Sequence, residues 1–180
     1  MTLEDLKFQC MNCNKCPLCK TRDNIVFGEG VSDADVLIIG EGPGANEDRE
    51  GRPFVGRSGK LLDEVMNEVG LSREKNVYIA NMVKCRPPEN RDPKPAEKEQ
   101  CIDYLKAQIE IINPKIIVCL GRVSASYFLG KDFKVTKDHG KFYEIDGRKI
   151  TATFHPAAIL RNINQKPLFL EDFQKIKKEI

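Results

Sequence analysis

The segment Gly40–Gly59, GEGPGANEDREGRPFVGRSG, decides how the rest of the chain can be arranged. It follows the apolar run Val36–Ile39, which is typical of a buried parallel strand, and it precedes residues 60–66, whose apolar spacing indicates a helix. Its six glycines allow a backbone to approach a ligand closely and to present N–H groups to it. Phe54 has little core to join from such a loop. An ordinary strand-to-helix connection is the alternative, but this composition favours a binding or catalytic loop.

Length and composition indicate one globular domain spanning residues 1–180. Apolar residues make up 41% of the chain and charged residues 31%. No apolar run is long enough for a membrane helix, and the N-terminus lacks the basic and apolar regions of a signal peptide. We therefore expect a cytoplasmic protein with no membrane association. The net charge of +2 is close to neutral and does not by itself indicate a nucleic-acid partner.

Short runs rich in isoleucine and valine alternate with stretches of helical periodicity along the chain. The sequence predicts strands over residues 35–40, 76–81, 115–120 and 149–154. It predicts helices over about 59–70, 95–113, 122–129 and 167–179. This alternation is typical of an α/β fold with a mainly parallel sheet and helices on both faces.

Unusual residues follow each of the four predicted strands. They lie, in chain order, in Glu41–Gly44, Asn81–Pro88, Leu120–Arg122 and Phe154–Pro156. Ligands bind at the carboxyl ends of the strands in sheets of this kind. We therefore expect the four segments to form one functional rim.

Cysteine is abundant, and its distribution is uneven. The first four of the seven cysteines are Cys10, Cys13, Cys16 and Cys19, on a segment 3–20 that we expect to be a helix broken near Pro17. The other three are isolated, at residues 85, 101 and 119. In a reducing compartment such clustering favours metal over disulfide. The spacing leaves open a zinc site, an iron–sulfur cluster or unrelated buried thiols.

With these segments in place, the chain closely resembles the family 4 uracil-DNA glycosylases, an iron–sulfur branch found in bacteria and archaea. The resemblance rests on GEGPG at 40–44, GRPFVG at 51–56, NMVKCRPP at 81–88 and TFHP at 153–156, with Leu160 and Arg161 beyond. It covers nearly the whole chain. It implies a three-layer fold whose central sheet has four mainly parallel strands. It also implies a monofunctional enzyme of base excision repair that hydrolyses the N-glycosidic bond of uracil in DNA.

The resemblance also selects among the cysteines. In this family a structural [4Fe-4S] cluster is held at the positions of Cys13, Cys16, Cys85 and Cys101. The cluster-binding segments are then residues 10–19 and 82–101. Cys10 and Cys19 are possible substitute ligands, whereas Cys119 lies in a predicted strand and is expected to be a small buried hydrophobe.

The family implies a uracil site on the rim. His155 is expected to stabilise the negative charge that develops on the leaving base, through uracil O2. The Asn81 amide pairs with uracil O4 and N3–H and rejects cytosine, whose donors and acceptors are reversed. Phe54 stacks on the base after it leaves the helix, and the turn at Gly42 and Pro43 offers backbone N–H groups to a uracil oxygen.

Glu41 and Glu47 are also expected to contact the uracil, and they are the candidates for the acidic role in catalysis. Relatives with a different active loop carry an aspartate where this chain has Gly42, so the role of that aspartate falls to another group or to none. Glu47 could exclude the thymine methyl group or position water, and Glu41 could stabilise positive charge or orient the loop. Asp48 and Glu50 are expected to be solvated.

DNA contacts are assigned to basic and small residues near the rim. The set is Arg52, Arg57, Ser58, Lys84, Arg86, Gly121, Arg122, Leu160 and Arg161. Leu160 and Arg161 are expected to enter the space that the base vacates. Ala157 stands where the family usually has a serine, so a hydroxyl contact to phosphate is missing here. The expected substrate is uracil-containing DNA, single- or double-stranded, bound by a monomer.

Two alternatives accompany this assignment. The family 5 glycosylases, which accept wider substrates, lack the acid of Glu41 and the amide of Asn81. A non-enzymatic alternative is an iron–sulfur DNA-binding or polymerase-accessory module. The segment Asp172–Ile180 has a basic helical face that could serve a replication or repair partner.

Overall fold

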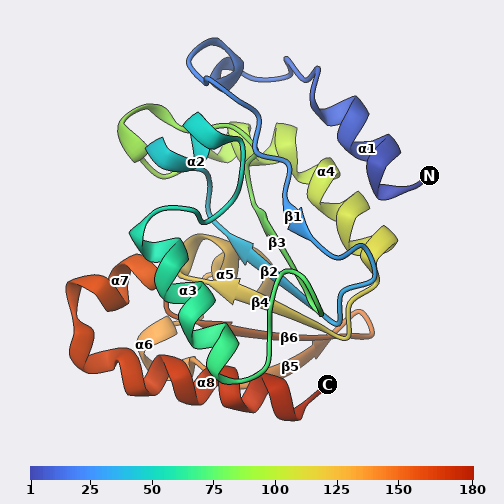
Figure 1. The fold of residues 1–180 in the computed structure, drawn as a ribbon. Coiled ribbons are helices and arrows are strands. Elements are labelled where there is room, and N and C mark those ends of the chain that lie inside the picture. The colour runs from blue at the N-terminus through green and yellow to red at the C-terminus, as the bar shows by residue number, and fades with distance from the viewer.

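The computed structural model describes all 180 residues and is built on one six-stranded sheet (Figure 1). The strands are β1 (Glu29–Gly30), β2 (Val36–Gly40), β3 (Val77–Asn81), β4 (Ile116–Leu120), β5 (Phe142–Ile145) and β6 (Arg148–Thr153), in the order β1-β3-β2-β4-β6-β5. The four inner strands are parallel, and the two edge strands pair antiparallel. The predicted four-stranded parallel core is confirmed, and the strand count is corrected to six.

The two added strands have simple local causes. β1 is a two-residue pairing of the extended arm that precedes β2. β5 forms a hairpin with β6 through Asp146 and Gly147, which both have positive φ, at 51° and 77°. An Asp-Gly pair is a favoured hairpin turn, because its backbone twist matches that of the flanking strands.

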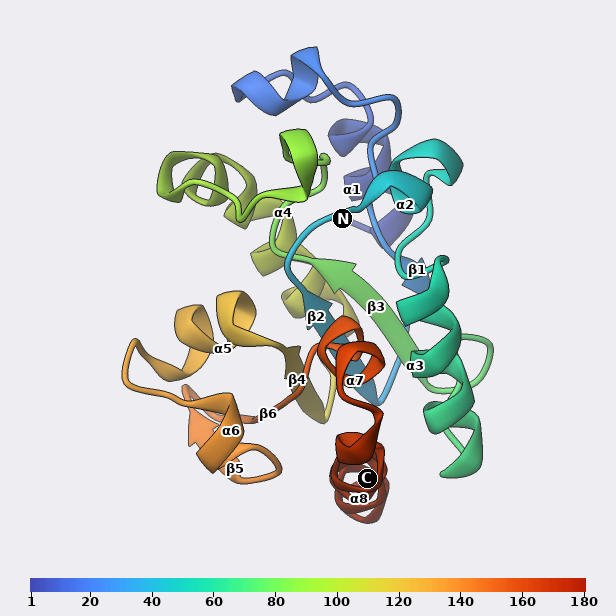
Figure 2. The same cartoon turned by 90° about the vertical axis from the view of Figure 1, so that its left-hand side faces the viewer.

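Helices cover both faces of the sheet (Figure 2). One face carries α3 (Arg57–Glu68), α7 (Pro156–Arg161) and α8 (Lys166–Lys178), whereas the other carries α4 (Pro95–Ile112) and α5 (Arg122–Leu129). The remaining elements are the helices α1 (Leu3–Cys10), α2 (Ala45–Glu50) and α6 (Val135–Asp138), and the 3-10 turns η1 (Pro17–Lys20), η2 (Pro88–Asn90) and η3 (Ile163–Gln165). The long helices agree with the predicted ranges to within two residues. No helix has both the length and the apolarity needed to cross a bilayer.

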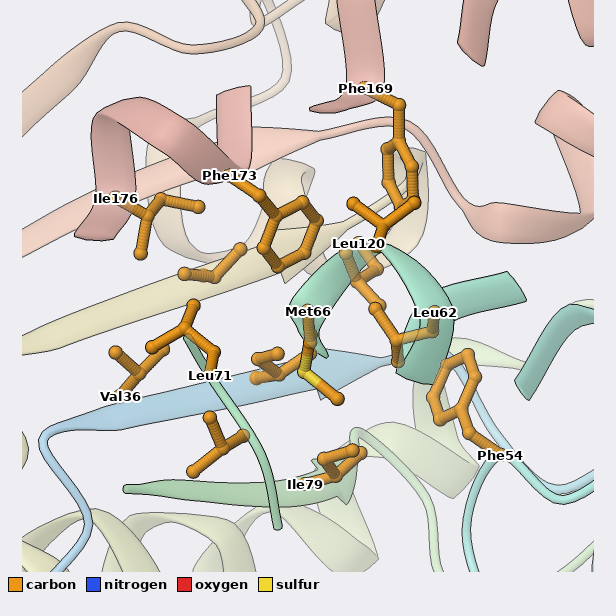
Figure 3. Packing of buried hydrophobic residues seen from close by; sticks show 14 of the residues in the cluster. Val36, Phe54, Leu62, Met66, Leu71, Ile79, Leu120, Phe169, Phe173 and Ile176 are labelled. Carbon is orange, nitrogen blue, oxygen red and sulfur yellow. The ribbon is translucent and has the colours of Figure 1, made fainter. Parts of the chain in front are cut away.

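Alternation along the strands divides the core into two layers. On β2, Val36 and Ile38 face α3 and α8, whereas Leu37 and Ile39 face α4 and α5. Figure 3 shows the first of these layers, in which Phe169 and Phe173 of α8 meet Leu62 and other residues of α3. Cys119 is fully buried in the second layer, which confirms its expected role as a small hydrophobe.

The N-terminal segment differs from the predicted helix. α1 ends at Cys10, and Met11 is its C-cap, so the helix stops well before Pro17. The rest of the segment turns through η1 and packs its apolar residues, among them Leu18 and Ile25, against Tyr104 of α4. This third, smaller cluster places the early cysteines beside Cys85 and Cys101.

Candidate active site

The carboxyl ends of the four parallel strands border one cleft of about 710 Å³. Register pairs Gly40 with Asn81 and Leu120 with Thr153, so the segments after these strands start at the same edge of the sheet. Every residue predicted to bind uracil lines this cleft, as do four of those predicted to bind DNA: Glu41, Gly42, Pro43, Glu47, Phe54, Asn81, His155, Ser58, Gly121, Arg122 and Arg161. The structure thus brings together the segments that the sequence predicts to form one rim.

Asn81 is the last residue of β3, and it lines the cleft with an amide whose oxygen is unpaired. It is 2% exposed, and its Oδ1 atom has no hydrogen-bond partner in the structure. Gly40 lies opposite, and a Cβ atom there would come within 2.5 Å of Asn81 Oδ1. Buried polar atoms without partners are rare in native proteins and are costly to maintain. The unpaired oxygen therefore indicates an acceptor reserved for a ligand donor.

His155 is held in one tautomer by the turn that starts α7. Its Nδ1 accepts a hydrogen bond from the Ala157 N–H at 3.1 Å, so the proton of the neutral ring resides on Nε2. Burial, with a smaller contribution from Arg161, lowers the pKa of His155 to about 4, although Glu47 opposes this shift. At neutral pH the ring is therefore an uncharged hydrogen-bond donor at the cleft wall.

Phe54 joins the cleft to the core. Its φ of 52° lies in the left-handed region, which non-glycine residues rarely adopt. The ring lines the cleft with its centroid 5.6 Å from that of His155, and it also belongs to the buried layer beside Leu62 (Figure 3). The expectation that Phe54 has little core to join is therefore wrong. A ring packed on the core is a rigid platform for a planar ligand.

Glu47 braces the glycine-rich segment from within. Its Oε1 accepts from the Gly44 N–H, and its Oε2 accepts from the N–H groups of Val55 and Gly56, each at 3.0 Å. One carboxylate thus ties the two limbs of the segment together at the cleft edge. Its neighbour Asp48 is 2% exposed and accepts from the N–H groups at 23 and 24, so the expectation that Asp48 is solvated is wrong.

Glu41 has an unusual electrostatic position on the cleft wall. Burial and the nearby carboxylate of Asp92 raise the pKa of Glu41 to about 7. A hydrogen bond from Arg122 lowers the pKa of Asp92, so of the two acids Asp92 is ionised first. Glu41 therefore titrates near neutral pH, as expected of a group in an active site.

Lys84 is not available to DNA, which corrects its predicted role. Its side chain is 1% exposed, and its Nζ donates to Asn81 O at 3.1 Å and to Gln108 Oε1 at 2.6 Å. Burial lowers the pKa of Lys84 to about 8. Since Gln108 lies on α4, the Lys84 ammonium group links the end of β3 to that helix. Gln108 in turn donates from its Nε2 to Phe27 O at 2.9 Å.

The other residues predicted to bind DNA are distributed over a wider surface. Arg52 makes two hydrogen bonds to Glu29, and Arg86 donates to Asn90 at 2.8 Å. Arg57 is exposed at the start of α3. Leu160 is half-buried against the core, whereas the cleft-lining Arg161 is exposed.

A second pocket gathers six of the seven cysteines. It is lined by Cys10, Cys13, Cys16, Cys19, Cys85 and Cys101. Arg22 donates to Cys85 Sγ and the Lys84 N–H donates to Cys101 Sγ, both at 3.3 Å. Burial raises the pKa of Cys10 to about 12 and that of Cys85 to about 11. No three of the chain's cysteine, histidine and acidic side chains are grouped as a single metal ion would require.

Several cleft residues were missed by the sequence reasoning. They are Asn90, Asp92, Val135, Thr136, Ala158 and Gln165. Asp92 stands in a proline-rich run whose path the sequence does not specify, and the segment around Thr136 has no periodicity that would place it. Phe154, by contrast, belongs to the rim segment that the sequence predicts after the fourth strand, and it lines the cleft.

Comparison with known proteins agrees with this geometry. Residues 27–178 match the family model described as the uracil DNA glycosylase superfamily. The chain is 49% identical to a type-4 uracil-DNA glycosylase of Thermotoga maritima, over 92% of this chain and 88% of that protein. It is 51% identical to the type-4 enzyme of Saccharolobus solfataricus, over 93% and 82%. Identity to a type-5 uracil-DNA glycosylase of Pyrobaculum aerophilum is 29%, over 82% and 71%. The chain belongs to the uracil DNA glycosylase superfamily.

Proposed function

We propose that this protein is a monofunctional uracil-DNA glycosylase, which hydrolyses the bond between uracil N1 and deoxyribose C1′ and leaves an abasic site in DNA. The observation that carries the proposal is the unpaired, buried side-chain amide oxygen of Asn81. Its buried amide offers an unpaired carbonyl to N3–H and an NH2 group to O4 of uracil. Cytosine presents an unprotonated N3 and an amino group at these positions and would leave both atoms unsatisfied.

The chemistry requires the base to leave as an anion while C1′ gains positive charge. His155 is fit for the first task, because it is neutral and keeps its proton on Nε2, where it can donate to uracil O2 as charge develops. Water adds at C1′ and loses a proton as the glycosidic bond breaks. No covalent intermediate with the protein is needed for this reaction.

The two glutamates take different parts in this proposal. Glu41, ionised above about pH 7, supplies negative charge near the sugar, which stabilises the developing positive charge at C1′. Glu47 keeps the glycine-rich segment folded through its three backbone bonds, and its position on the cleft wall supports a role in water placement or thymine exclusion.

The cysteine pocket is proposed to hold a [4Fe-4S] cluster on Cys13, Cys16, Cys85 and Cys101. The donor set fits, because these thiols line one pocket without the close grouping that a single zinc ion needs, and each iron of a cluster requires only one thiolate. Such a cluster supplies crosslinks and no electrons to the hydrolysis. It would fasten segment 10–19 to segment 82–101.

DNA is proposed to bind across the cleft mouth in single- or double-stranded form. Arg161 supplies positive charge there, and Arg57 is exposed next to the cleft-lining Ser58, whereas Arg122 is paired with Asp92. Ser58 and Gly121 offer small polar groups to phosphates. Residues 1–180 are proposed to form one domain. A monomeric state and binding of replication or repair proteins stay predictions.

The test is cleavage of single-stranded oligonucleotides that carry one uracil, thymine or hypoxanthine, with abasic sites revealed by alkali. Asn81→Ala and His155→Ala should each lower the rate on uracil by about 100-fold or more, whereas Lys115→Ala, at the opposite end of the sheet, should not. Cleavage of hypoxanthine as well would indicate a broader specificity. Failure of the intact, iron-loaded protein to cleave uracil would overturn the proposal and favour the DNA-binding module.

A further inference from the structure

Phe54 is held in an unfavourable backbone conformation by a residue outside the cleft. A non-glycine residue at φ 52° persists only where its surroundings hold it in place. Arg73, in the connection between α3 and β3, supplies that restraint, because it is 8% exposed and its guanidinium is directed at the backbone of Pro53 and Phe54. Arg73 does not line the cleft.

The guanidinium of Arg73 makes four hydrogen bonds at once. Its Nη1 donates to Pro53 O and its Nη2 to Phe54 O, both at 2.6 Å. Its Nε donates to Asp63 Oδ1 at 3.0 Å, and Nη1 also donates to Glu29 Oε2 at 2.8 Å. Asp63 and Glu29 hold the planar guanidinium group in one orientation. In that orientation the guanidinium group holds the two successive carbonyl groups of Pro53 and Phe54. Lysine, a point charge without this planar geometry, cannot reproduce the arrangement.

A second contact, with Gly59 of α3, restrains the Phe54 carbonyl group. A Cβ atom at Gly59, in the first turn of α3, would lie 1.9 Å from Phe54 O and 2.1 Å from its carbon. Glycine is therefore required for α3 to approach the Phe54 backbone this closely. On the ring side, a Cβ atom at Gly40 would lie 2.7 Å from the Phe54 ring, so the ring has no room to move toward β2.

We infer that Arg73 is a positioning residue for the glycosylase reaction, which acts by clamping the Pro53 and Phe54 carbonyls so that the Phe54 ring is fixed for stacking on the flipped base. The inference rests on the proposed function, because a fixed ring matters only if a base stacks on it. Stacking of a base on an aromatic side chain contributes roughly tenfold or more to affinity, and a displaced ring loses that contribution.

The test is a double-mutant cycle on the full-length, iron-loaded protein, measuring kcat, KM and Tm. Arg73→Lys should lower kcat/KM on a uracil oligonucleotide about tenfold. In a Phe54→Ala background the same substitution should have almost no effect on kcat/KM, while it lowers Tm in both backgrounds. Arg148→Lys is the matched control, because Arg148 also ties carbonyl and carboxylate oxygens, of Asn113 and Glu110, but far from the cleft. It should leave kcat/KM unchanged.

Gly59→Ala is a second variant that displaces the Phe54 carbonyl, and with it the bond from Arg73, while the Arg73 side chain itself is unchanged. It should also lower kcat/KM only when the Phe54 ring is present, and it provides the test if Arg73→Lys does not fold. An active wild type with equal losses in both backgrounds would overturn the positioning role and leave the glycosylase proposal intact. An inactive wild type would overturn both.

Discussion

Asn81 and Lys84 lie three residues apart at the end of β3, and burial gives them different tasks. Asn81 keeps an unpaired carbonyl at the cleft, whereas Lys84 donates to the backbone carbonyl of Asn81 from the opposite side. In sequence Asn81 closes a predicted strand and Lys84 lies in the segment that follows it, and both were expected to contact the substrate. Only the register of β3 and the position of Gln108 decide that Lys84 faces inward.

Replacement of Asn81 by aspartate tests recognition at a single atom. Asn81→Asp exchanges an amide donor for a second acceptor, which repels uracil O4 and removes a hydrogen bond that the site was built to make. We expect the rate on uracil to fall by about 100-fold or more. Single-turnover cleavage of a uracil oligonucleotide measures the loss, and circular dichroism shows whether the fold is retained. A variant that is folded and retains full uracil activity would contradict the assignment.

The raised pKa of Glu41 predicts that glycosylase activity increases as the pH rises through neutrality. Burial and Asp92 raise the pKa of Glu41 to about 7, so the carboxylate forms only as the pH rises through neutrality. If the carboxylate stabilises positive charge on the sugar, kcat/KM should increase between about pH 6 and 8. Glu41→Gln should lower activity at pH 8 and abolish this increase. His155, with a pKa of about 4, adds a loss of activity only at much lower pH. A wild-type profile that Glu41→Gln leaves unchanged would exclude Glu41 from this role.

The same raised pKa predicts that the stability of the folded protein decreases with pH, whereas the activity increases. A carboxyl group whose pKa in the folded protein exceeds its unfolded value favours folding below the unfolded pKa, and it loses that contribution as the pH rises through about 7. The loss runs from the unfolded pKa of 4.5 up to about 7, so above about pH 7 the ionised Glu41 carboxylate destabilises the fold relative to low pH.

At the scale of elements, the four parallel strands were predictable almost to the residue. β2, β3 and β4 are mostly apolar runs that are buried on both faces, whereas β6, RKITAT, is buried only from Ile150 to Thr153. Short buried runs of five or six residues are typical of strands, because helices of globular proteins are usually longer. α2 was hidden because its six residues, ANEDRE, lie inside a glycine-rich segment and form through Glu47 and the left-handed Gly51. The Asp146-Gly147 pair is typical of a hairpin turn and could have predicted the β5–β6 hairpin, but the search for apolar runs did not consider turn residues.

The elements around the cysteine pocket give a prediction that separates ligands from bystanders. Cys101 lies on α4 and Cys19 in η1, and both line the pocket. If the cluster uses Cys13, Cys16, Cys85 and Cys101, Cys101→Ser should lose iron and lower Tm by more than about 4 °C, because α4 is released from the N-terminal segment. Cys19→Ser is the matched control and should retain both iron and Tm. Loss of iron in Cys19→Ser with retention in Cys101→Ser would assign the ligands differently.

At the scale of the whole molecule, the two ends of the parallel sheet differ in what they carry. The carboxyl ends of the parallel strands carry the cleft, while the opposite end carries exposed ion pairs such as Lys115 with Asp35. Net charge could not reveal this polarity, since the chain sums to +2. Many of its arginines are held by acids, among them Arg52, Arg91 and Arg122, so the charge available for phosphate is smaller than the sequence suggests.

Salt dependence of DNA binding measures that available charge. Arg161 is exposed, lines the cleft and is paired with no acid, so it should neutralise one phosphate. Arg161→Gln should reduce the slope of log K against log salt by about 1 for a uracil-free oligonucleotide, on which no turnover occurs. Lys115→Gln removes one positive charge from the opposite end of the sheet and should leave the slope unchanged, which excludes an effect of net charge alone. Fluorescence anisotropy titrations over a range of salt concentrations give both slopes. Equal slopes for Arg161→Gln and the wild type would place the DNA elsewhere than across this cleft.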